Sequence, residues 1–183
     1  MTAISEILGS KLISQKGETI STDSLAGKNK VLALYFSAHW CPPCRGFTPV
    51  LKEFYENVKS SENGNNFDIV FVSSDREESQ FDEYFGEMPW KALPYAERDL
   101  KVSTNCIQSL KYFEDILVML LYFEKAKVSK KFKVSGIPTL VFLDAETGKL
   151  ITDEGRNIVG DDKEGKNFPW RPKPFSEIFK GKL

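Results

Sequence analysis

The sequence predicts an α/β fold in which helices flank a central mixed β-sheet. Three largely apolar runs, at 31–36, 67–72 and 139–143, are bounded by polar or turn-forming residues and are typical of buried strands. A stretch with helical periodicity separates the first two runs. Strand, helix and strand in this order favour a parallel unit with a right-handed crossover.

The helix after the first strand is predicted to begin at Pro43. Apolar residues recur at three- and four-residue intervals over 47–58, which indicates one buried helix face. Pro42 and Pro43 suit the first helical turn, where a backbone N–H has no intrahelical partner. Pro49 lies inside the periodic stretch and is expected to kink the helix.

A second helix is predicted to follow the strand at 67–72. Asp75 and Glu78 have the spacing of a capping box, in which two side chains satisfy free N–H groups at a helix start. Apolar residues at 81–85 then supply a buried helix face.

The remaining sequence is predicted to complete a single domain, 1–183. A turn at 144–148 would join the strand at 139–143 to another at 149–152, giving an antiparallel hairpin. The segment 157–183 is charged and contains several prolines. We interpret it as a C-terminal wrap over the domain surface.

Composition and charge argue against several classes of protein. The 25 Lys and Arg residues balance 26 Asp and Glu residues, so the net charge of −1 gives no overall bias toward nucleic acid or an anionic membrane. Three cysteines are too few for a disulfide-rich secreted scaffold. The longest apolar run, 116–123, is far short of the ~20 residues that span a bilayer, and residues 1–14 lack the pattern of a secretory signal. We therefore expect a protein of the reducing cytosol that binds no nucleic acid and has no membrane span.

Cys41-Pro42-Pro43-Cys44 is the candidate site with the clearest chemistry. It lies where the first strand should end and the first helix begin, so Cys41 would occupy a helix N-terminus, which stabilises a thiolate and lowers the pKa of the thiol. Cys44 returns to the same helix face three residues later and is the candidate resolving thiol. This arrangement predicts dithiol–disulfide exchange through a mixed disulfide.

Two other roles are compatible with the C-x-x-C spacing. Zinc would require four ligands, and the chain could supply only Cys41, Cys44, Cys106 and His39. Zinc sites usually contain a second close-spaced pair, which this sequence lacks, so we expect no metal. A purely structural disulfide is disfavoured in a reducing compartment.

The run from Phe36 to Pro49 resembles the thioredoxin superfamily, and in particular its tryparedoxin and nucleoredoxin branch. Further matches are Val72-Ser73-Ser74-Asp75-Arg76, Glu87-Met88-Pro89-Trp90, Gly136-Ile137-Pro138-Thr139-Leu140 and Asn167-Phe168-Pro169-Trp170. The resemblance covers most of the chain. It implies a thioredoxin fold with Cys41 as nucleophile and Cys44 as resolving thiol.

The resemblance also implies roles for residues around the dithiol. Pro138 would form a cis peptide bond with Ile137 and align the substrate backbone, and Trp40 would shield the dithiol. Ordinary thioredoxins carry a buried Asp in the strand before the motif, whereas Tyr35 occupies that position here. A different proton relay is therefore expected, involving Tyr35, water or Asp75.

Two further features close to the site are candidate modulators. His39 could stabilise the Cys41 thiolate or respond to pH, or it could be an ordinary solvent-facing loop residue. Five lysines precede Pro138 and would form either the solvated face of a helix or a patch that attracts acidic partners. These are Lys125, Lys127, Lys130, Lys131 and Lys133.

Residues 102–125 look like an insertion relative to the family that the chain resembles. This segment contains the apolar run and Cys106, which is either a passive thiol or one half of a regulatory disulfide. It is either an extra helix that buries its apolar face on the domain or on a partner, or a retained in-frame intron. Sequencing of transcripts would distinguish the two.

The motif and the resemblance together predict a protein-disulfide reductase of the cytosol or nucleus. Its redox-active disulfide would be Cys41–Cys44, with no bound cofactor and with an external thiol or reductase as electron donor. Its partners would be disulfide-containing proteins. Two alternatives are a redox-controlled adaptor that binds a signalling partner and a tryparedoxin-like electron carrier that serves peroxidases.

Overall fold

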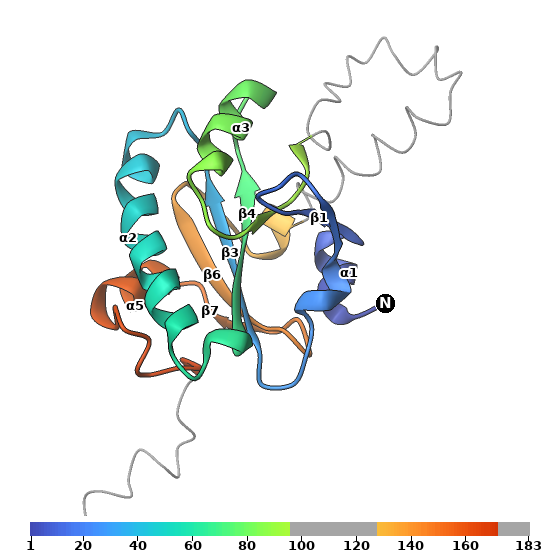
Figure 1. The fold of residues 1–183 in the computed structure, drawn as a ribbon, viewed down its shortest axis with the longest axis vertical. Coiled ribbons are helices and arrows are strands. Elements are labelled where there is room, and N and C mark those ends of the chain that lie inside the picture. The colour runs from blue at the N-terminus through green and yellow to red at the C-terminus, as the bar shows by residue number, and fades with distance from the viewer. Residues whose placement is uncertain (96–127, 172–183) are drawn as a thin grey trace, which may run out of the picture.

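The computed structural model describes residues 1–95 and 128–171 (Figure 1). The predicted insertion 102–125 and the end of the C-terminal wrap lie outside the described residues. The strands are β1 (Lys11–Ile13), β2 (Thr19–Ser21), β3 (Val31–Ser37), β4 (Phe67–Ser73), β5 (Lys91–Ala92), β6 (Thr139–Asp144) and β7 (Leu150–Thr152). The helices are α1 (Ala3–Leu8), α2 (Pro42–Ser60), α3 (Glu78–Gly86) and α5 (Gly155–Asp161).

The strands form one mixed sheet in the order β2-β1-β5-β4-β3-β6-β7. β3 is an interior strand, parallel to β4 on one side and antiparallel to β6 on the other, and all seven of its residues are buried. This arrangement confirms the predicted parallel unit and the hairpin of β6 and β7. The three predicted central strands are the long ones. β1, β2 and β5 were not predicted, because runs of two or three residues are too short to show a period.

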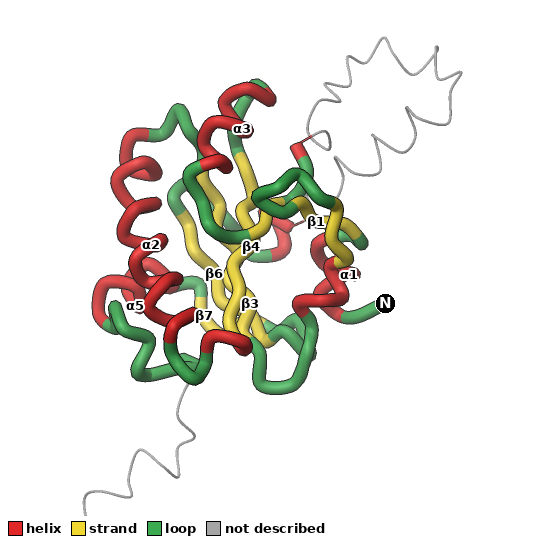
Figure 2. Tube along the Cα trace, in the orientation of Figure 1, coloured by secondary structure: helices red, strands yellow, loops and turns green. Residues whose placement is uncertain are grey.

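Helices cover both faces of the sheet (Figure 2). Buried residues of α2, α3 and α5 pack against one face, which carries Tyr35 of β3 and Phe71 of β4. Buried residues of α1 pack against the other face with Leu34 of β3 and Val70 of β4. The alternation of side chains along β3 and β4 therefore supplies two separate cores from the same strands.

The predicted capping box at the start of α3 is wrong. The N-cap residue is Glu77, and no side chain caps this helix start. Asp75 is fully buried and its carboxylate accepts hydrogen bonds from the backbone N–H of His39 and the hydroxyl of Ser73. Asp75 therefore forms hydrogen bonds with residues outside α3 and does not cap that helix.

The first residues of the predicted C-terminal wrap belong to α5. The strap that follows, 162–171, is mostly exposed or half-buried and packs Phe168 and Trp170 against the core. The ring of Trp170 contacts the rings of Phe54, Phe67, Phe142 and Phe168 at centroid distances of 5.0–5.5 Å. Over the described ranges, no helix is long and apolar enough to cross a membrane.

Candidate active site

The two cysteines lie where β3 ends and α2 begins. Cys41 is the N-cap residue of α2, and Pro42 and Pro43 fill the first two helical positions. A disulfide joins Cys41 to Cys44, and their Cα atoms are 5.2 Å apart. Because both prolines lack a backbone N–H, the helix start offers Cys41 fewer free donors than an ordinary one. The macrodipole remains to stabilise a thiolate at this position.

The two sulfur-bearing side chains differ in their access to solvent. Cys41 is 5% exposed, whereas Cys44 is 0% exposed. Ala38 and Ile137 pack around the pair. Only Cys41 can therefore be reached by a large disulfide substrate without a change in the protein.

Ile137 and Pro138 come from the segment before β6 and lie against the dithiol. The peptide bond between them is cis, and Pro138 is buried. The Sγ atom of Cys41 lies 3.8 Å from the carbonyl oxygen of Ile137. The antiparallel pairing of β6 with β3 explains the proximity, because the start of β6 and the end of β3 meet at the same edge of the sheet.

Trp40 borders the dithiol and is held by the segment after β4. Its Nε1 donates to the carbonyl oxygen of Ser74 at 3.0 Å, and its side chain is 47% exposed. The guanidinium of Arg76 lies over the indole, 5.5 Å from the ring centroid. An indole at the rim, half open to solvent, can contact a substrate as well as shield the disulfide.

Asp75 fixes the loop that precedes Cys41. One carboxylate oxygen accepts from the backbone N–H of His39 at 2.5 Å, and the other accepts from the Ser73 hydroxyl at 2.7 Å. The ring of His39 lies 5.7 Å from the ring of Tyr84. These contacts place His39 and Asp75 beside the dithiol, with Asp75 engaged in holding the loop.

A cluster of buried hydroxyl groups lies beneath Cys44. Tyr35 Oη donates to the Cys44 carbonyl oxygen at 3.3 Å and lies 2.8 Å from Thr48 Oγ1. Ser37 donates to Tyr35 at 3.0 Å, and Tyr84 Oη lies 3.0 Å from Ser37 Oγ. Burial, reinforced by the nearby Tyr84, raises the pKa of Tyr35 well above its ordinary value.

Three members of this hydroxyl cluster, Ser37, Thr48 and Tyr84, were not among the predicted site residues. Their signal in the sequence is a hydroxyl group on a predicted apolar face, which is ambiguous because buried hydroxyls often bond only to their own helix. Thr48 does make such a bond, to the Cys44 carbonyl oxygen at 3.1 Å. What the sequence could not show is that α2, α3 and β3 bring these hydroxyls together.

A groove of about 550 Å³ opens beside Pro138. Phe47 and Val50 of α2 line one side, and Arg156 and Asn157 of α5 line the other. The guanidinium of Arg156 lies 5.4 Å from the centroid of the Phe47 ring. The groove therefore combines apolar and charged groups next to Pro138.

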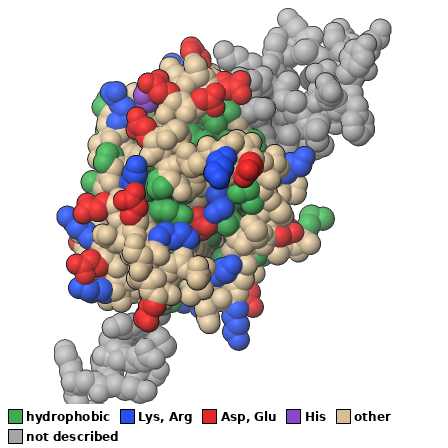
Figure 3. All heavy atoms as spheres, in the orientation of Figure 1, with side chains coloured by type: hydrophobic (Ala, Val, Ile, Leu, Met, Phe, Trp, Pro, Cys, Tyr) green, Lys and Arg blue, Asp and Glu red, His purple; other side chains and the backbone are tan. Residues whose placement is uncertain are grey.

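Charged side chains of both signs are spread over the visible surface (Figure 3). Of the predicted lysine cluster, Lys130, Lys131 and Lys133 are described, and all three are exposed. Lys125 and Lys127 lie outside the described residues, as does Cys106. Among side chains that the structure does describe, no three His, Cys, Asp or Glu residues form a group that could hold a metal ion.

Comparison with known proteins gives consistent matches. The model of a family described as thioredoxin-like matches residues 29–150. Nucleoredoxin from Homo sapiens is 38% identical over 173 residues, which cover 94% of this chain but 33% of the nucleoredoxin. Tryparedoxin from Trypanosoma brucei brucei is 42% identical over 159 residues, covering 87% of this chain and 90% of the tryparedoxin. The chain thus spans about a third of the length of the nucleoredoxin.

Solved structures agree with these sequence matches. Native tryparedoxin I from Crithidia fasciculata has a TM-score of 0.71 and 36% sequence identity, with 93% of this chain and 99% of that chain covered. At this level of similarity, the mixed seven-stranded sheet and its flanking helices are those of the thioredoxin fold.

Proposed function

Because the chain belongs to the thioredoxin-like family, we propose that it is a thiol–disulfide oxidoreductase that reduces protein disulfides through Cys41 and Cys44. The observation that supports this most directly is the pair itself. Cys41, at the start of α2, is slightly exposed, whereas Cys44 is fully buried. Their Cα atoms are 5.2 Å apart. We further propose that the protein acts in the cytosol or nucleus.

In the proposed reaction, the Cys41 thiolate attacks one sulfur of a substrate disulfide. A new bond forms between the two sulfurs, and the second substrate sulfur leaves as a thiolate that takes a proton from water. Cys44, after losing its proton, then attacks the Sγ of Cys41 and releases the other substrate thiol. Two electrons pass to the substrate, and an external thiol or reductase returns the Cys41–Cys44 disulfide to the dithiol.

The surroundings of the pair support this sequence of steps. The Ile137 carbonyl lies next to Cys41 and can pair with the backbone of an extended substrate, while the adjacent groove can receive its side chains. Tyr35 holds the Cys44 carbonyl from below. We assign Asp75 to positioning the loop, because one of its oxygens accepts from the backbone N–H of His39 and the other accepts from the Ser73 hydroxyl.

A trapping experiment tests the proposal. Cys44→Ser should stall at the mixed disulfide, so that disulfide-containing proteins remain covalently attached to Cys41 and are released by excess reductant. Cys41→Ser is the matched control, because it removes the accessible thiol and should capture nothing. Wild-type protein should reduce a generic protein disulfide in the presence of an external dithiol. A folded Cys44→Ser protein that captures no more than the control would refute the mechanism.

A second candidate is an electron carrier of the tryparedoxin type, and the near full-length match to tryparedoxin favours it. It shares the same dithiol chemistry but differs in its acceptor, a peroxidase. Turnover that depends on an added peroxidase, with little reduction of generic disulfides, would identify it. Stoichiometric binding of a partner in one redox state, without turnover, would instead identify the redox-controlled adaptor.

A further inference from the structure

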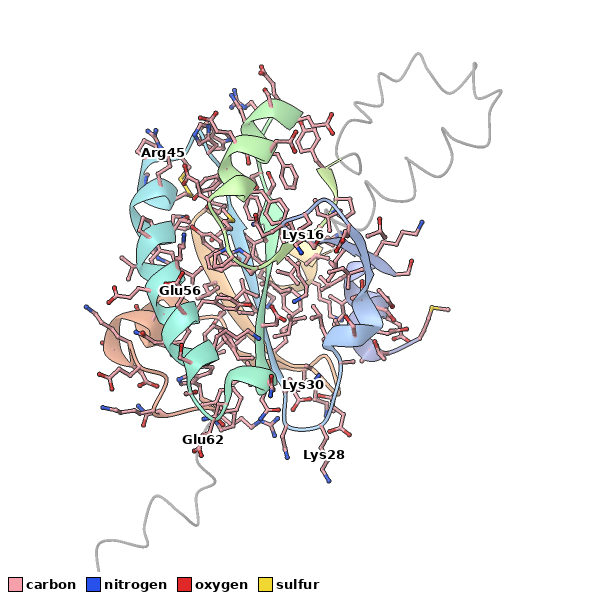
Figure 4. The ribbon with its side chains drawn as sticks, in the orientation of Figure 1. Lys16, Lys28, Lys30, Arg45, Glu56 and Glu62 are labelled. Carbon is pink, nitrogen blue, oxygen red and sulfur yellow. A yellow bond between two sulfur atoms is a disulfide. The ribbon has the colours of Figure 1, made fainter. Side chains whose placement is uncertain are left out.

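Three of the four arginines in the described ranges lie at the site or line the groove beside Pro138. Arg45 directly follows Cys44 and lies beside the disulfide at the start of α2 (Figure 4). The guanidinium of Arg76 lies over the ring of Trp40, and that of Arg156 lies over the ring of Phe47. None of the three forms an ion pair with a described carboxylate. The fourth, Arg171, pairs with Asp144 at 2.6 Å and lies in the C-terminal strap.

Of the three arginines near the site, Arg76 lies over the ring of the residue that directly precedes Cys41. The indole beneath it is anchored through Nε1 to the Ser74 carbonyl, and Trp40 is the residue immediately before Cys41. A guanidinium attracted to an aromatic face can still donate hydrogen bonds from its N–H groups to a second partner. Glu77 and Glu78 follow in the chain and are exposed, yet neither lies within ion-pairing distance of Arg76 as the structure describes them. Among the described residues, the Arg76 guanidinium therefore has no carboxylate partner, and it lies over the residue next to Cys41.

We propose that Arg76 is a specificity-determining residue that binds a carboxylate of the disulfide substrate. The inference rests on the proposed function and narrows it to disulfides in acidic segments, with an Asp or Glu near the attacked cysteine. The planar fork of Arg76 suits two parallel hydrogen bonds to one carboxylate, a geometry that a lysine at the same position would not provide. At an exposed site, an ion pair between Arg76 and a substrate carboxylate should raise the kcat/KM for that substrate by about two- to fivefold.

The test uses two disulfide peptides that are identical except at one position near a cysteine, where one peptide has Glu and the other has Gln. Wild-type protein should reduce the Glu peptide with a kcat/KM about two- to fivefold higher. Arg76→Gln should bring this ratio of the Glu peptide to the Gln peptide close to one, and Arg76→Glu should lower it below one because like charges repel. Lys28→Gln removes one positive charge at the far end of the molecule and is the matched control that should keep the wild-type ratio (Figure 4). An unchanged ratio in Arg76→Gln, or an equal loss in Lys28→Gln, would overturn the proposal.

A binding measurement separates this proposal from the proposed function. The same peptides, with serine in place of cysteine, are titrated onto the oxidised protein while the Trp40 indole N–H signal is followed by NMR. That signal is assigned by its loss in Trp40→Phe. Tighter binding of the Glu peptide in the wild type but not in Arg76→Gln supports the proposal even if no peptide is reduced. Equal binding of both peptides by the wild type counts against it even if both are reduced.

Discussion

At the residue scale, the difference in burial between Cys41 and Cys44 gives each thiol its own chemistry. Cys41 is 5% exposed and Cys44 is 0% exposed. In the reduced protein, a small alkylating reagent should therefore modify Cys41 at least ~10-fold faster than Cys44. Peptide mapping by mass spectrometry at short reaction times measures both rates in one sample. Equal rates would show that the buried thiol is as accessible as its neighbour.

Tyr35 should make folding stability depend on pH in the alkaline range. Burial raises the pKa of Tyr35 in the folded protein above the ordinary value near 10, so the unfolded chain releases this proton at a lower pH. The contribution of Tyr35 to folding stability is therefore complete below pH 10 and is lost as the pH rises further. Tyr55 is shifted in the same direction, by burial and by Asp68.

Tyr35→Phe isolates this contribution. It removes hydrogen bonds to the Cys44 carbonyl and to Thr48, and we expect a loss of about 1–2 kcal/mol at pH 7. Urea unfolding at pH 7 and above pH 10 should show a shallower alkaline decline in the variant than in the wild type. Parallel declines would mean that Tyr35 does not titrate differently in the two states.

At the element scale, α3 begins without a side-chain cap. Glu77 is its N-cap residue, in an extended conformation with φ −131° and ψ 145°, and forms no capping hydrogen bond. Glu77→Ser should add one and stabilise the protein by about 0.5–1 kcal/mol in thermal unfolding. Glu83→Ser removes the same charge from the middle of α3 and should not stabilise. Equal gains in both variants would point to relief of charge repulsion instead.

Most elements that could be predicted from the sequence have enough residues to show a period, whereas the three-residue β7 was predicted from the turn before it. β3, β4 and α2 are long, and their apolar patterns gave their approximate bounds. β5 has two residues, and β1 and β2 have three each, so tertiary pairing alone defines them. The position of the dithiol at the start of α2 was predictable because strand, motif and helix are contiguous.

The sequence pattern could not predict contacts between elements that are distant in the chain. Asp75 was assigned to a helix cap, but its carboxylate instead accepts a hydrogen bond from the backbone N–H of His39. The hydroxyl cluster depends on the register of β3 against α2 and α3. Periodicity identifies which face of an element is buried, but it does not identify the residue on another element that meets it.

At the scale of the whole molecule, the dithiol and the C-terminal strap lie at opposite ends of β4. The strap's Trp170 contacts Phe67, the first residue of β4, whereas Ser73, its last residue, bonds the Asp75 that supports the site. Six residue steps in a strand span about 20 Å. Changes at the two ends should therefore act independently.

Trp170→Ala tests this separation. It leaves a gap among the rings of Phe54, Phe67 and Phe142 and removes the bond from Trp170 Nε1 to Asp162, so we expect a loss of about 3 kcal/mol in urea unfolding. The alkylation rate of Cys41 should not change. In the double variant with Tyr35→Phe, the two losses should add to within about 0.5 kcal/mol. A slower or faster Cys41 reaction would reveal coupling along the sheet.

The hydroxyl cluster beneath Cys44 contains more close oxygen pairs than it has hydrogens to fill them. Tyr35, Ser37, Thr48 and Tyr84 carry one hydroxyl hydrogen each, yet six oxygen–oxygen contacts join them to one another and to the Cys44 carbonyl. At any instant at least two contacts hold no hydrogen. The hydroxyl hydrogens can therefore be redistributed while every heavy atom stays in place. The electrostatic field at Cys44 can thus adapt to its thiol, thiolate or disulfide form at little structural cost.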